Sequence, residues 1–455
     1  MTKVDVTILG GGPGGYLAAE RLAHAGKKVV LVEADELGGT CLNVGCIPTK
    51  TLLNSAKLYS HALHSSAYGV NVEGASYDWA KMQSWKNEVV KGLVGGIGAM
   101  EKRLGVNVIK GYGVFKGPGR VEVNGELIES EHVIIATGSV PVIPPIPGLQ
   151  DNPSVVDSTG LLSIPEVPGR LAVIGGGVIG VEFAQLFAAL GSKVSVIEMM
   201  PEIAPMVDKD LAVMMRKSMP EITFSLGCKV TKVEGGTVHY LSAAGAEETV
   251  EADTILVAVG RKAAVEGWGA QESGLDLYRG GVVADERMRT NLPNVWAIGD
   301  VNGKSLLAHS AYRMAEVAVA NILDPQAHRR GEILRTNMVP WVIYTQPEVA
   351  GVGLTEDQAR EAGYEVVTAT APGYMSGRYV AETSFRAPGA AKIVVDAESQ
   401  QVLGIQVIAS YASEMIWGAV AVLELEMMLG DLRQLTIPHP TVSELIREAA
   451  WAVKI

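Results

Sequence analysis

The sequence predicts an α/β fold with two Rossmann-like dinucleotide-binding domains followed by a C-terminal α+β domain. A glycine fingerprint of the form G-x-G-x-x-G occurs twice, each time between an apolar strand and a helix. Each copy is followed by a second apolar strand that ends in glutamate. From about residue 335 the pattern changes to alternating apolar and polar residues, which is typical of antiparallel strands.

The first fingerprint begins near the start of the sequence. Residues 4–10 form an apolar strand that leads into Gly10, Gly12 and Gly15. We expect a helix over residues 16–25 and a second strand over 26–33, which ends at Glu33. The glycines allow the backbone to approach a pyrophosphate at the helix N-terminus, and the glutamate can accept hydrogen bonds from ribose hydroxyls.

The second fingerprint repeats the first at identical spacing. A strand over residues 171–174 leads into Gly175, Gly177 and Gly180, and the second strand ends at Glu198. In both copies the second strand starts at a glycine 16 residues after the first fingerprint glycine, and the glutamate lies 23 residues after it. A single fingerprint is weak evidence, but two copies in matching surroundings predict that the protein binds two dinucleotides.

Further elements follow from the apolar pattern. A late strand closes each dinucleotide unit, one ending at Gly138 and the other at Gly260, and a proline-rich run at 141–147 is a plausible crossover. Another strand ends in Gly299-Asp300, where a carboxylate can face a nucleotide sugar. In the C-terminal part, we expect the strands and helices 391–396, 402–409, 414–429 and 441–453, in that order.

Length and composition indicate a large globular protein. The 455 residues suggest about three domains, and 48% of them are hydrophobic. The formal net charge of −12 argues against nucleic acid as a partner. Residues 171–191 are long enough to span a membrane, but Glu182, Gln185 and the glycine cluster favour a strand, turn and helix. We therefore expect a cytoplasmic protein with no signal peptide and no membrane segment.

Cys41 and Cys46 stand out among the three cysteines because four residues separate them, and Cys41 lies eight residues after Glu33, the end of the second strand. A close pair in a cytosolic protein usually binds metal or carries out redox chemistry. Zinc normally needs four ligands, and no second Cys/His pair with suitable spacing is present in the sequence, so we expect no metal. The pair is interpreted as redox-active, with two buried small apolar residues as the alternative.

Seven segments together resemble the pyridine nucleotide–disulfide oxidoreductases over the whole chain, and most closely the branch that oxidises dihydrolipoamide. The segments occur in the order typical of that family, and the second and third are the most specific. They are Gly10 to Gly15, Cys41 to Lys50, Gly175 to Gly180, Ala297 to Asp300, Leu307 to His309, Tyr344 to Glu348 and His439 to Glu444.

The resemblance implies FAD at the first fingerprint, NAD at the second, and a homodimer whose active sites each use His439 and Glu444 of the partner chain. Cys41 would exchange with substrate, and Cys46 would lie against the flavin as a charge-transfer thiolate. The remaining roles are Lys50 and Glu182 as an ion pair near the flavin N5, Asp300 on the ribityl chain, and the Ala308 amide on the flavin ring. The implied domains are FAD-binding (1–147), NAD-binding (148–267), central and completing the FAD site (268–334), and dimerisation (335–455).

Several of these residues have simpler explanations. His439 is one of eight histidines and is distinguished, apart from the resemblance, by prolines on both sides at an expected helix start. Glu444 completes a possible capping box with Thr441. Lys50 and Glu182 could be surface charges. The chain also departs from the family pattern in three places. These are position 437, which is isoleucine, the residues that follow Arg261, and residues 310–314.

The expected activity is oxidation of protein-bound dihydrolipoamide by NAD⁺ through FAD and a Cys41–Cys46 disulfide. The expected partner is a lipoyl-bearing carrier protein or acyltransferase of a 2-oxo acid dehydrogenase or glycine cleavage complex. One alternative is another NAD(P)H-dependent disulfide or mercuric reductase. Glu198 and the uncharged residues 199–201 disfavour the 2′-phosphate of NADPH, and the chain has no C-terminal cysteine pair. A non-catalytic flavoprotein subunit is the alternative of another class.

Overall fold

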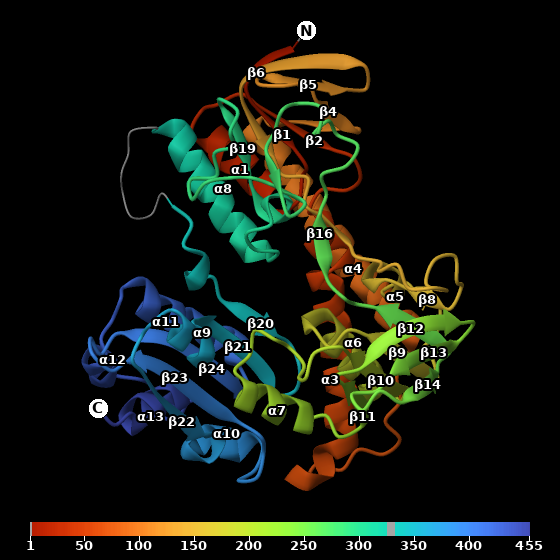
Figure 1. The fold of residues 1–455 in the computed structure, drawn as a ribbon, viewed down its shortest axis with the longest axis vertical. Helices are drawn as coiled ribbons and strands as arrows, with labels where there is room; N and C mark the ends of the chain where they lie inside the picture. Colours follow the sequence, from red (N-terminus) through yellow and green to blue (C-terminus); the bar gives the residue numbers. More distant parts are fainter. Residues whose placement is uncertain (1, 325–332) are drawn as a thin grey trace. The chain divides into compact units, whose positions relative to one another are not determined.

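The computed structural model describes residues 2–324 and 333–455, which form two compact units (Figure 1). Unit 1 comprises the described residues within Met1–Val142, Asp157–Glu166 and Gly260–Thr336. Unit 2 comprises Ile143–Val156, Val167–Val259 and Asn337–Ile455. The chain therefore passes between the units several times, and each unit is assembled from segments that are distant in sequence.

Unit 1 is built on a seven-stranded sheet in the order β3-β2-β1-β6-β5-β4, with β19 paired to β6. β1, β2, β3, β6 and β19 pair in parallel, whereas β4 and β5 are antiparallel. This strand order is half of a doubly wound fold, as predicted. The strands are β1 (Thr2–Leu9), β2 (Val29–Glu33), β3 (Asn107–Lys110), β4 (Gly113–Phe115), β5 (Arg120–Val123), β6 (Glu126–Ile135) and β19 (Val295–Ala297).

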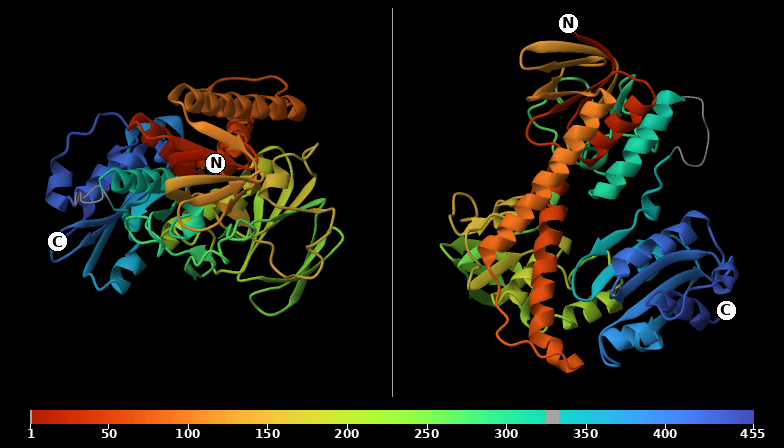
Figure 2. Two further views of the ribbon diagram at one scale, coloured as in Figure 1. Left: turned by 90° about the horizontal axis from the view of Figure 1, so that it is seen from above. Right: turned by 180° about the vertical axis from the view of Figure 1, so that it is seen from behind.

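Four main helices accompany this sheet. α1 (Pro13–His24) packs against α8 (Ala308–Leu323). It confirms the helix expected over 16–25, although it begins three residues earlier, within the first fingerprint. α3 (Cys46–His64) and α4 (Trp79–Leu104) run side by side (Figure 2). Smaller elements complete the unit: α2 (Gly39–Val44), α5 (Ser158–Leu161), β7 (Ser139–Pro141), β16 (Arg261–Ala263), β17 (Leu277–Tyr278) and β18 (Gly281–Val282).

Unit 2 contains the second dinucleotide-type sheet, in the order β11-β10-β9-β15-β8 with every pairing parallel. The segment 171–191 forms β9, a glycine turn and α6, so the expectation for this segment is confirmed. A separate antiparallel sheet consists of β12, β13 and β14. The elements are β8 (Val155–Val156), β9 (Arg170–Ile174), α6 (Val178–Ala189), β10 (Lys193–Glu198), α7 (Lys209–Lys217), β11 (Ile222–Leu226), β12 (Lys229–Glu234), β13 (Thr237–Leu241), β14 (Glu247–Glu251) and β15 (Thr254–Val257).

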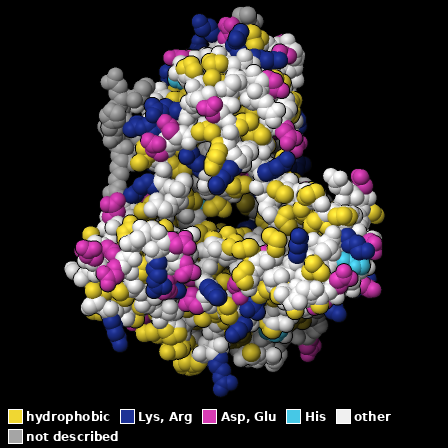
Figure 3. Space-filling view, viewed as in Figure 1, with side chains coloured by type: hydrophobic (Ala, Val, Ile, Leu, Met, Phe, Trp, Pro, Cys, Tyr) yellow, Lys and Arg dark blue, Asp and Glu magenta, His cyan; other side chains and the backbone are white. Residues whose placement is uncertain are grey.

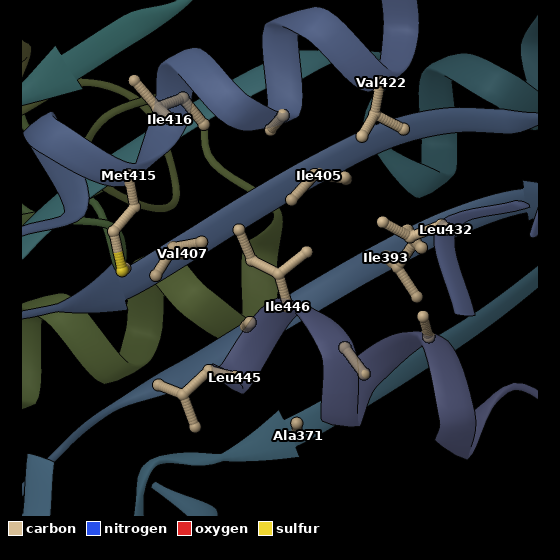
Figure 4. Packing of buried hydrophobic residues seen from close by; sticks show 14 of the residues in the cluster. Ala371, Ile393, Ile405, Val407, Met415, Ile416, Val422, Leu432, Leu445 and Ile446 are labelled. Carbon is tan, nitrogen blue, oxygen red and sulfur yellow. The ribbon is translucent and has the colours of Figure 1, made fainter. Parts of the chain in front are cut away.

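The C-terminal part of unit 2 is an antiparallel sheet in the order β20-β21-β24-β23-β22, with helices packed against it (Figure 4). Ile393 and Ile405 project from its central strands into a core shared with Leu445. The predicted strands 391–396 and 402–409 are confirmed. The elements are β20 (Trp341–Ile343), β21 (Glu348–Gly353), α9 (Glu356–Glu361), β22 (Val366–Pro372), α10 (Gly377–Glu382), β23 (Ala390–Asp396), β24 (Val402–Ala409), α11 (Ala412–Glu424), α12 (Leu429–Gln434) and α13 (Glu444–Ala452).

The two helices predicted for this region differ from those observed. The expected helix 414–429 is wrong at its end, because α11 stops at Glu424 and Glu426 adopts a left-handed conformation at φ +53°. Met427 and Met428 then pair with the β23–β24 hairpin instead of continuing the helix, and α12 begins at Leu429. The helix expected from Thr441 begins later, at Glu444.

In the described part of the chain, no helix combines the length and the apolar run that a bilayer crossing requires. On the face seen in Figure 3, lysine and arginine side chains are interspersed with aspartate and glutamate.

Candidate active site

The glycines of the first fingerprint form a tight turn between β1 and α1. Gly10 has φ +103°, and a Cβ there would lie 2.3 Å from the Ala136 carbonyl oxygen. A Cβ on Gly15 would lie 1.8 Å from the carbonyl oxygen of Gly10. By contrast, a Cβ on Gly12 would meet nothing nearer than 3.8 Å. Gly10 and Gly15 thus fix the turn, and Gly12 leaves open space at the N-terminus of α1, where a phosphate can bind.

The second fingerprint repeats this geometry. Gly175 has φ +109°, with 2.5 Å between its would-be Cβ and the Ala258 oxygen, and a Cβ on Gly180 would lie 2.0 Å from the Gly175 oxygen. Around the would-be Cβ of Gly177 there is open space to 4 Å. The two fingerprints therefore share their backbone geometry as well as their sequence spacing, and both turns fit the pyrophosphate of a dinucleotide.

The glutamate at the end of each second strand is held in the same way. Oε2 of Glu33 accepts from the Gly11 amide at 2.6 Å, and its Oε1 accepts from Asp35 at 2.8 Å. Oε2 of Glu198 accepts from the Gly176 amide at 2.5 Å, and its Oε1 accepts from Met200 at 2.6 Å. A carboxylate has about four acceptor positions, so each can still receive ribose hydroxyls.

Asp300 lies in a short polar chain next to the first site. Its Oδ2 accepts from the Ser139 hydroxyl at 2.6 Å, and that hydroxyl accepts in turn from Nε of Arg261 at 2.8 Å. Burial raises the pKa of Asp300, and the Ser139 hydrogen bond and the charge of Arg261 partly offset this. Arg261 also donates to the Ser139 carbonyl at 2.8 Å and lies 3.5 Å from the Thr40 hydroxyl, next to Cys41.

The other cofactor residues predicted for this region lie at turns and a helix start. Ala308 is the first residue of α8, whose free amides face outward from a helix N-terminus. Gly138 and Gly260, both with positive φ, precede the crossing strands β7 and β16. Gly260 begins the segment that returns the chain to unit 1, although the sequence associated it with NAD.

The two cysteines flank a break between helices. Cys41 lies within α2, Cys46 is the first residue of α3, and Gly45 separates the helices. Lys50 follows Cys46 by one turn of α3, which places both on one face of the helix. Cys46 is exposed, whereas Cys228 is buried, so two buried apolar side chains do not describe this pair.

The pair shares a hydrogen bond that affects the protonation of Cys41. The side-chain hydrogen bond with Cys46 raises the pKa of Cys41, burial raises it further, and the charge of Lys50 opposes both. A helix N-terminus favours a thiolate, and Cys46 occupies that position. The arrangement therefore favours a protonated sulfur at Cys41.

Glu182 lies in unit 2 and is not a surface charge. The residue is 3% exposed on α6, and its Oε1 accepts from the Tyr344 amide at 3.0 Å. Gln185, one turn later, exchanges hydrogen bonds with the Gln346 backbone at 3.2 and 2.7 Å. The Tyr344 to Glu348 segment noted in the sequence is thus anchored on α6.

His439 and Glu444 form a pair in unit 2. Nδ1 of His439 lies 2.8 Å from Oε1 of Glu444, while 75% of the histidine side chain is exposed. Oε2 of Glu444 accepts from the Thr441 amide at 3.0 Å. Burial tends to raise the pKa of Glu444, but the hydrogen bonds from His439 and Thr441 outweigh it, and the pKa lies below its usual value. One carboxylate therefore both holds the imidazole and completes half of the capping box. His439 itself precedes the helix by five residues rather than standing at its start.

Some residues of the site were not found from the sequence. Ser139 and Arg261 link Asp300 to helix α2, which carries Cys41, and the arginine's place directly after Gly260 was the available signal. Tyr16, directly after the first fingerprint, contacts the Tyr312 hydroxyl through its own. Burial and this hydrogen bond raise the pKa of Tyr16, to which the nearby Cys41 also contributes.

Comparisons with known proteins agree with this geometry. Residues 4–315 match the pyridine nucleotide-disulphide oxidoreductase family, and residues 339–450 match its dimerisation domain. A dihydrolipoyl dehydrogenase of Thermus scotoductus is 42% identical over 100% of this chain and 98% of its own, and one of Pisum sativum mitochondria is 38% identical over 98% and 91%.

Solved structures of the same fold cover nearly the whole chain. The HOCl-induced flavoprotein disulfide reductase RclA of Escherichia coli is 30% identical, with a TM-score of 0.86 over 99% of this chain and 100% of that one. LpdA of Mycobacterium tuberculosis is 26% identical, with a TM-score of 0.88 over 99% of both chains. The dihydrolipoyl dehydrogenases use FAD and NAD(H), which the two fingerprints fit. The chain belongs to the pyridine nucleotide–disulphide oxidoreductase family, as a FAD-dependent, NAD-linked enzyme with a C-terminal dimerisation domain.

Proposed function

We propose that this protein oxidises protein-bound dihydrolipoamide with NAD⁺ as acceptor, through a disulfide between Cys41 and Cys46. The observation that carries the proposal is the hydrogen-bonded thiol pair across Gly45, with Lys50 one turn away and the FAD-type fingerprint in the same unit. Relatives that match nearly all of the chain are dihydrolipoyl dehydrogenases.

The thiol chemistry divides between the two cysteines. One substrate thiol loses its proton, and its sulfur attacks Cys41 of the disulfide, forming a mixed disulfide and releasing Cys46 as a thiolate. The second substrate thiol then loses its proton and attacks the first substrate sulfur, which closes the lipoamide disulfide and releases Cys41. Two electrons and two protons leave the substrate, and the dithiol holds the electrons. Bound FAD supplies the chemistry that passes these electrons on to NAD⁺ as a hydride.

His439 is the proposed base for the substrate thiols. Because Nδ1 is engaged by Glu444, Nε2 is the nitrogen that accepts a proton. The buried carboxylate orients the ring and stabilises it when it is charged. We propose that His439 and Glu444 serve the active site of the partner chain, in keeping with the dimerisation domain.

The remaining assignments are proposals of the same kind. The FAD would be held by the first fingerprint, Glu33, Asp300 and the amide of Ala308, and the NAD by the second fingerprint and Glu198. Lys50 and Glu182 would act as a pair near the flavin. We place the domain boundaries at 147/148, 267/268 and 334/335. The proposed location is cytoplasmic. The proposed partner is a lipoyl-bearing protein of a 2-oxo acid dehydrogenase or glycine cleavage complex.

The second candidate is another disulfide or metal-ion reductase. One structural neighbour is the Cu(II) complex of a flavoprotein disulfide reductase at 30% identity, and the exposed Cys46 thiol is the kind of group that a soft metal ion could reach. A non-catalytic subunit is disfavoured by the intact pair of thiols and the histidine–glutamate pair.

Steady-state assays distinguish these functions. The purified holoenzyme is assayed with dihydrolipoamide, glutathione disulfide, mercuric ion and cupric ion, each with NAD(H) and NADP(H). We expect the highest kcat/KM for dihydrolipoamide with NAD⁺. A higher value for glutathione disulfide or for a metal ion would replace the proposal with the second candidate. An enzyme that keeps its FAD but turns over none of these substrates would support the non-catalytic subunit.

A further inference from the structure

The segment that follows Glu198 contains a charged pair whose function is not explained by the NAD site itself. Residues 199–208 include no lysine or arginine, and Met199 and Met200 are exposed beside Glu198. The next acidic residue, Glu202, is 14% exposed in its side chain and binds Arg216 of α7. The guanidinium of Arg216, which belongs to α7, is therefore bound to a segment that has no cation of its own.

Glu202 uses both oxygens on the guanidinium. Nε of Arg216 donates to Oε1 at 2.8 Å, and Nη2 donates to Oε2 at 3.0 Å. This parallel arrangement is the strong, bidentate form of an arginine–carboxylate pair. It also satisfies the edge of the guanidinium that would otherwise bind a phosphate, and it leaves the pair with no net charge.

The residues that follow Glu202 pack on the ribose end of the second fingerprint. Ile203, next to Glu202, has a methyl carbon 3.0 Å from the position that a Cβ of Gly176 would take, and Cβ of Glu198 lies 3.2 Å from the same point. The Ala204 amide donates to the Gly176 carbonyl at 2.9 Å. Gly176 is also the residue whose amide binds Glu198, so the segment that carries Glu202 packs on the residues that hold the ribose acid.

We propose that Glu202 determines nicotinamide specificity by masking Arg216, a latent ligand for the 2′-phosphate of NADP(H). Glu198 rejects the phosphate directly, and Glu202 removes the nearby guanidinium from use as its counterion. Enzymes that accept NADP place an arginine at this end of the second strand. Here Arg216 comes instead from α7, and the carboxylate of Glu202 holds it. The inference rests on the proposed placement of NAD at the second fingerprint and does not involve the thiol pair.

Binding of 2′,5′-ADP to the FAD-loaded dimer tests the proposal, with 5′-AMP as the ligand that lacks the 2′-phosphate. We expect Glu202→Gln to tighten 2′,5′-ADP binding by about tenfold and to change 5′-AMP binding less than about twofold. Anaerobic reduction of the flavin by NADPH should accelerate in parallel, while reduction by NADH stays the same. The exposed Glu221, substituted as Glu221→Gln, is the matched control and should change neither.

Two further variants complete the test. In Glu202→Gln/Arg216→Gln the gain should disappear, since the freed cation is gone. In Arg216→Gln alone, Glu202 is left without its counterion, and 2′,5′-ADP should bind more weakly than to the unsubstituted protein while 5′-AMP is unaffected. The proposal is overturned if Glu202→Gln leaves 2′,5′-ADP binding unchanged or if the gain persists without Arg216. Failure of the unsubstituted protein to bind 5′-AMP would instead reject the placement of NAD.

Discussion

Cys41 and Cys46 lie on opposite sides of Gly45, and the fold gives them different surroundings. Cys41 is partly buried and its pKa is raised by the hydrogen bond to Cys46, whereas Cys46 is exposed at the first position of α3. The sequence alone was sufficient to find the pair, because four residues separate two of only three cysteines. Their inequality depends on where α2 ends and α3 begins, and the sequence pattern did not predict these helices.

This inequality predicts different outcomes for the two serine variants. Cys41→Ser should abolish dihydrolipoamide turnover but keep FAD bound and keep a long-wavelength absorption band from the Cys46 thiolate. Cys46→Ser should lose both turnover and the band. Absorption spectra and turnover of the purified variants provide the measurement, and Cys228→Ser, which changes a buried thiol elsewhere, should alter neither. A band that survives in Cys46→Ser and vanishes in Cys41→Ser would exchange the two roles.

Glu101 is a buried acid that the proposed chemistry does not use. It is 1% exposed on α4, and its Oε2 has no hydrogen-bond partner among the described residues. Burial, followed by the charge of Glu20, raises its pKa to about 7 from the ordinary value of 4.5. Because the folded-state pKa is raised, the neutral acid is favoured by folding. Ionisation of Glu101 therefore lowers the free energy of unfolding. This loss is absent below about pH 4.5, grows as the pH rises toward 7, and is constant above that.

We expect Glu101→Gln to flatten this dependence. The variant should gain about 1–3 kcal/mol over the unsubstituted protein at pH 8 and lose that advantage at pH 5. Thermal unfolding of the FAD-loaded protein between pH 5 and 8 measures it. Glu88→Gln on the exposed part of the same helix is the matched control and should follow the unsubstituted protein. Parallel curves for Glu101→Gln and the unsubstituted protein would show that Glu101 is ionised across this range.

At the scale of elements, the sequence predicted strands more successfully than helices. β1, β9, β23 and β24 were expected within a few residues of their observed bounds, because each is a short apolar or alternating run. The 26-residue helix α4 was not found, since it buries only Trp79, Met82 and two charged residues and has little apolar pattern. Its ends carried the available signals, an N-cap at Asp78 and a left-handed glycine at Gly105.

A buried ion cluster joins three elements of unit 2. Nζ of Lys392 on β23 lies 3.5 Å from Asp208, 3.1 Å from Asp210 and 3.0 Å from Glu356. Lys392 and Asp208 are 5% and 6% exposed. Burial raises the pKa of Asp208, although the lysine charge opposes it. Lys392 thus pairs with three carboxylates at the junction of β23 with the starts of α7 and α9, and Glu356 also pairs with Arg360 at 2.7 Å.

Lys392→Met should destabilise the protein by about 3–5 kcal/mol, because it leaves the buried carboxylate of Asp208 without its counterion. The loss should be larger at pH 8 than at pH 5, since protonation of the carboxylates relieves their repulsion. Thermal unfolding at both pH values measures it, with Lys217→Met on the exposed side of α7 as the control. An equal loss at both pH values would mean that packing, not charge, is the contribution of Lys392.

At the scale of the whole molecule, the repeated fingerprint predicted the two dinucleotide-type sheets and their order along the chain. The assembly of each unit from separated segments could not be predicted, because it depends on contacts such as that of Lys86 on α4 with the Leu162 carbonyl at 2.7 Å. The Asp300–Ser139–Arg261 chain was missed for the same reason, since β7 and β16 become neighbours only in the folded chain.

The proposed sharing of active sites between chains is the property of the whole molecule that is most open to test. Cys41 lies in unit 1 and the His439–Glu444 pair lies in unit 2, within a chain that carries a dimerisation domain. His439→Gln should lower dihydrolipoamide oxidation by about 10²–10⁴-fold, the usual effect of losing a general base. Reduction of the flavin by NADH should change little, because that half of the reaction needs no base.

Mixed dimers decide whether His439 acts across the dimer. Each parent, Cys41→Ser and His439→Gln, is inactive or nearly so, and heterodimers are isolated with two different affinity tags. If each site takes Cys41 from one chain and His439 from the other, the heterodimer has one site with both defects and one with neither. Activity per heterodimer should then approach half that of the unsubstituted dimer. If both residues come from one chain, every site keeps a defect, and the absence of recovery in confirmed heterodimers would place the complete site within a single subunit.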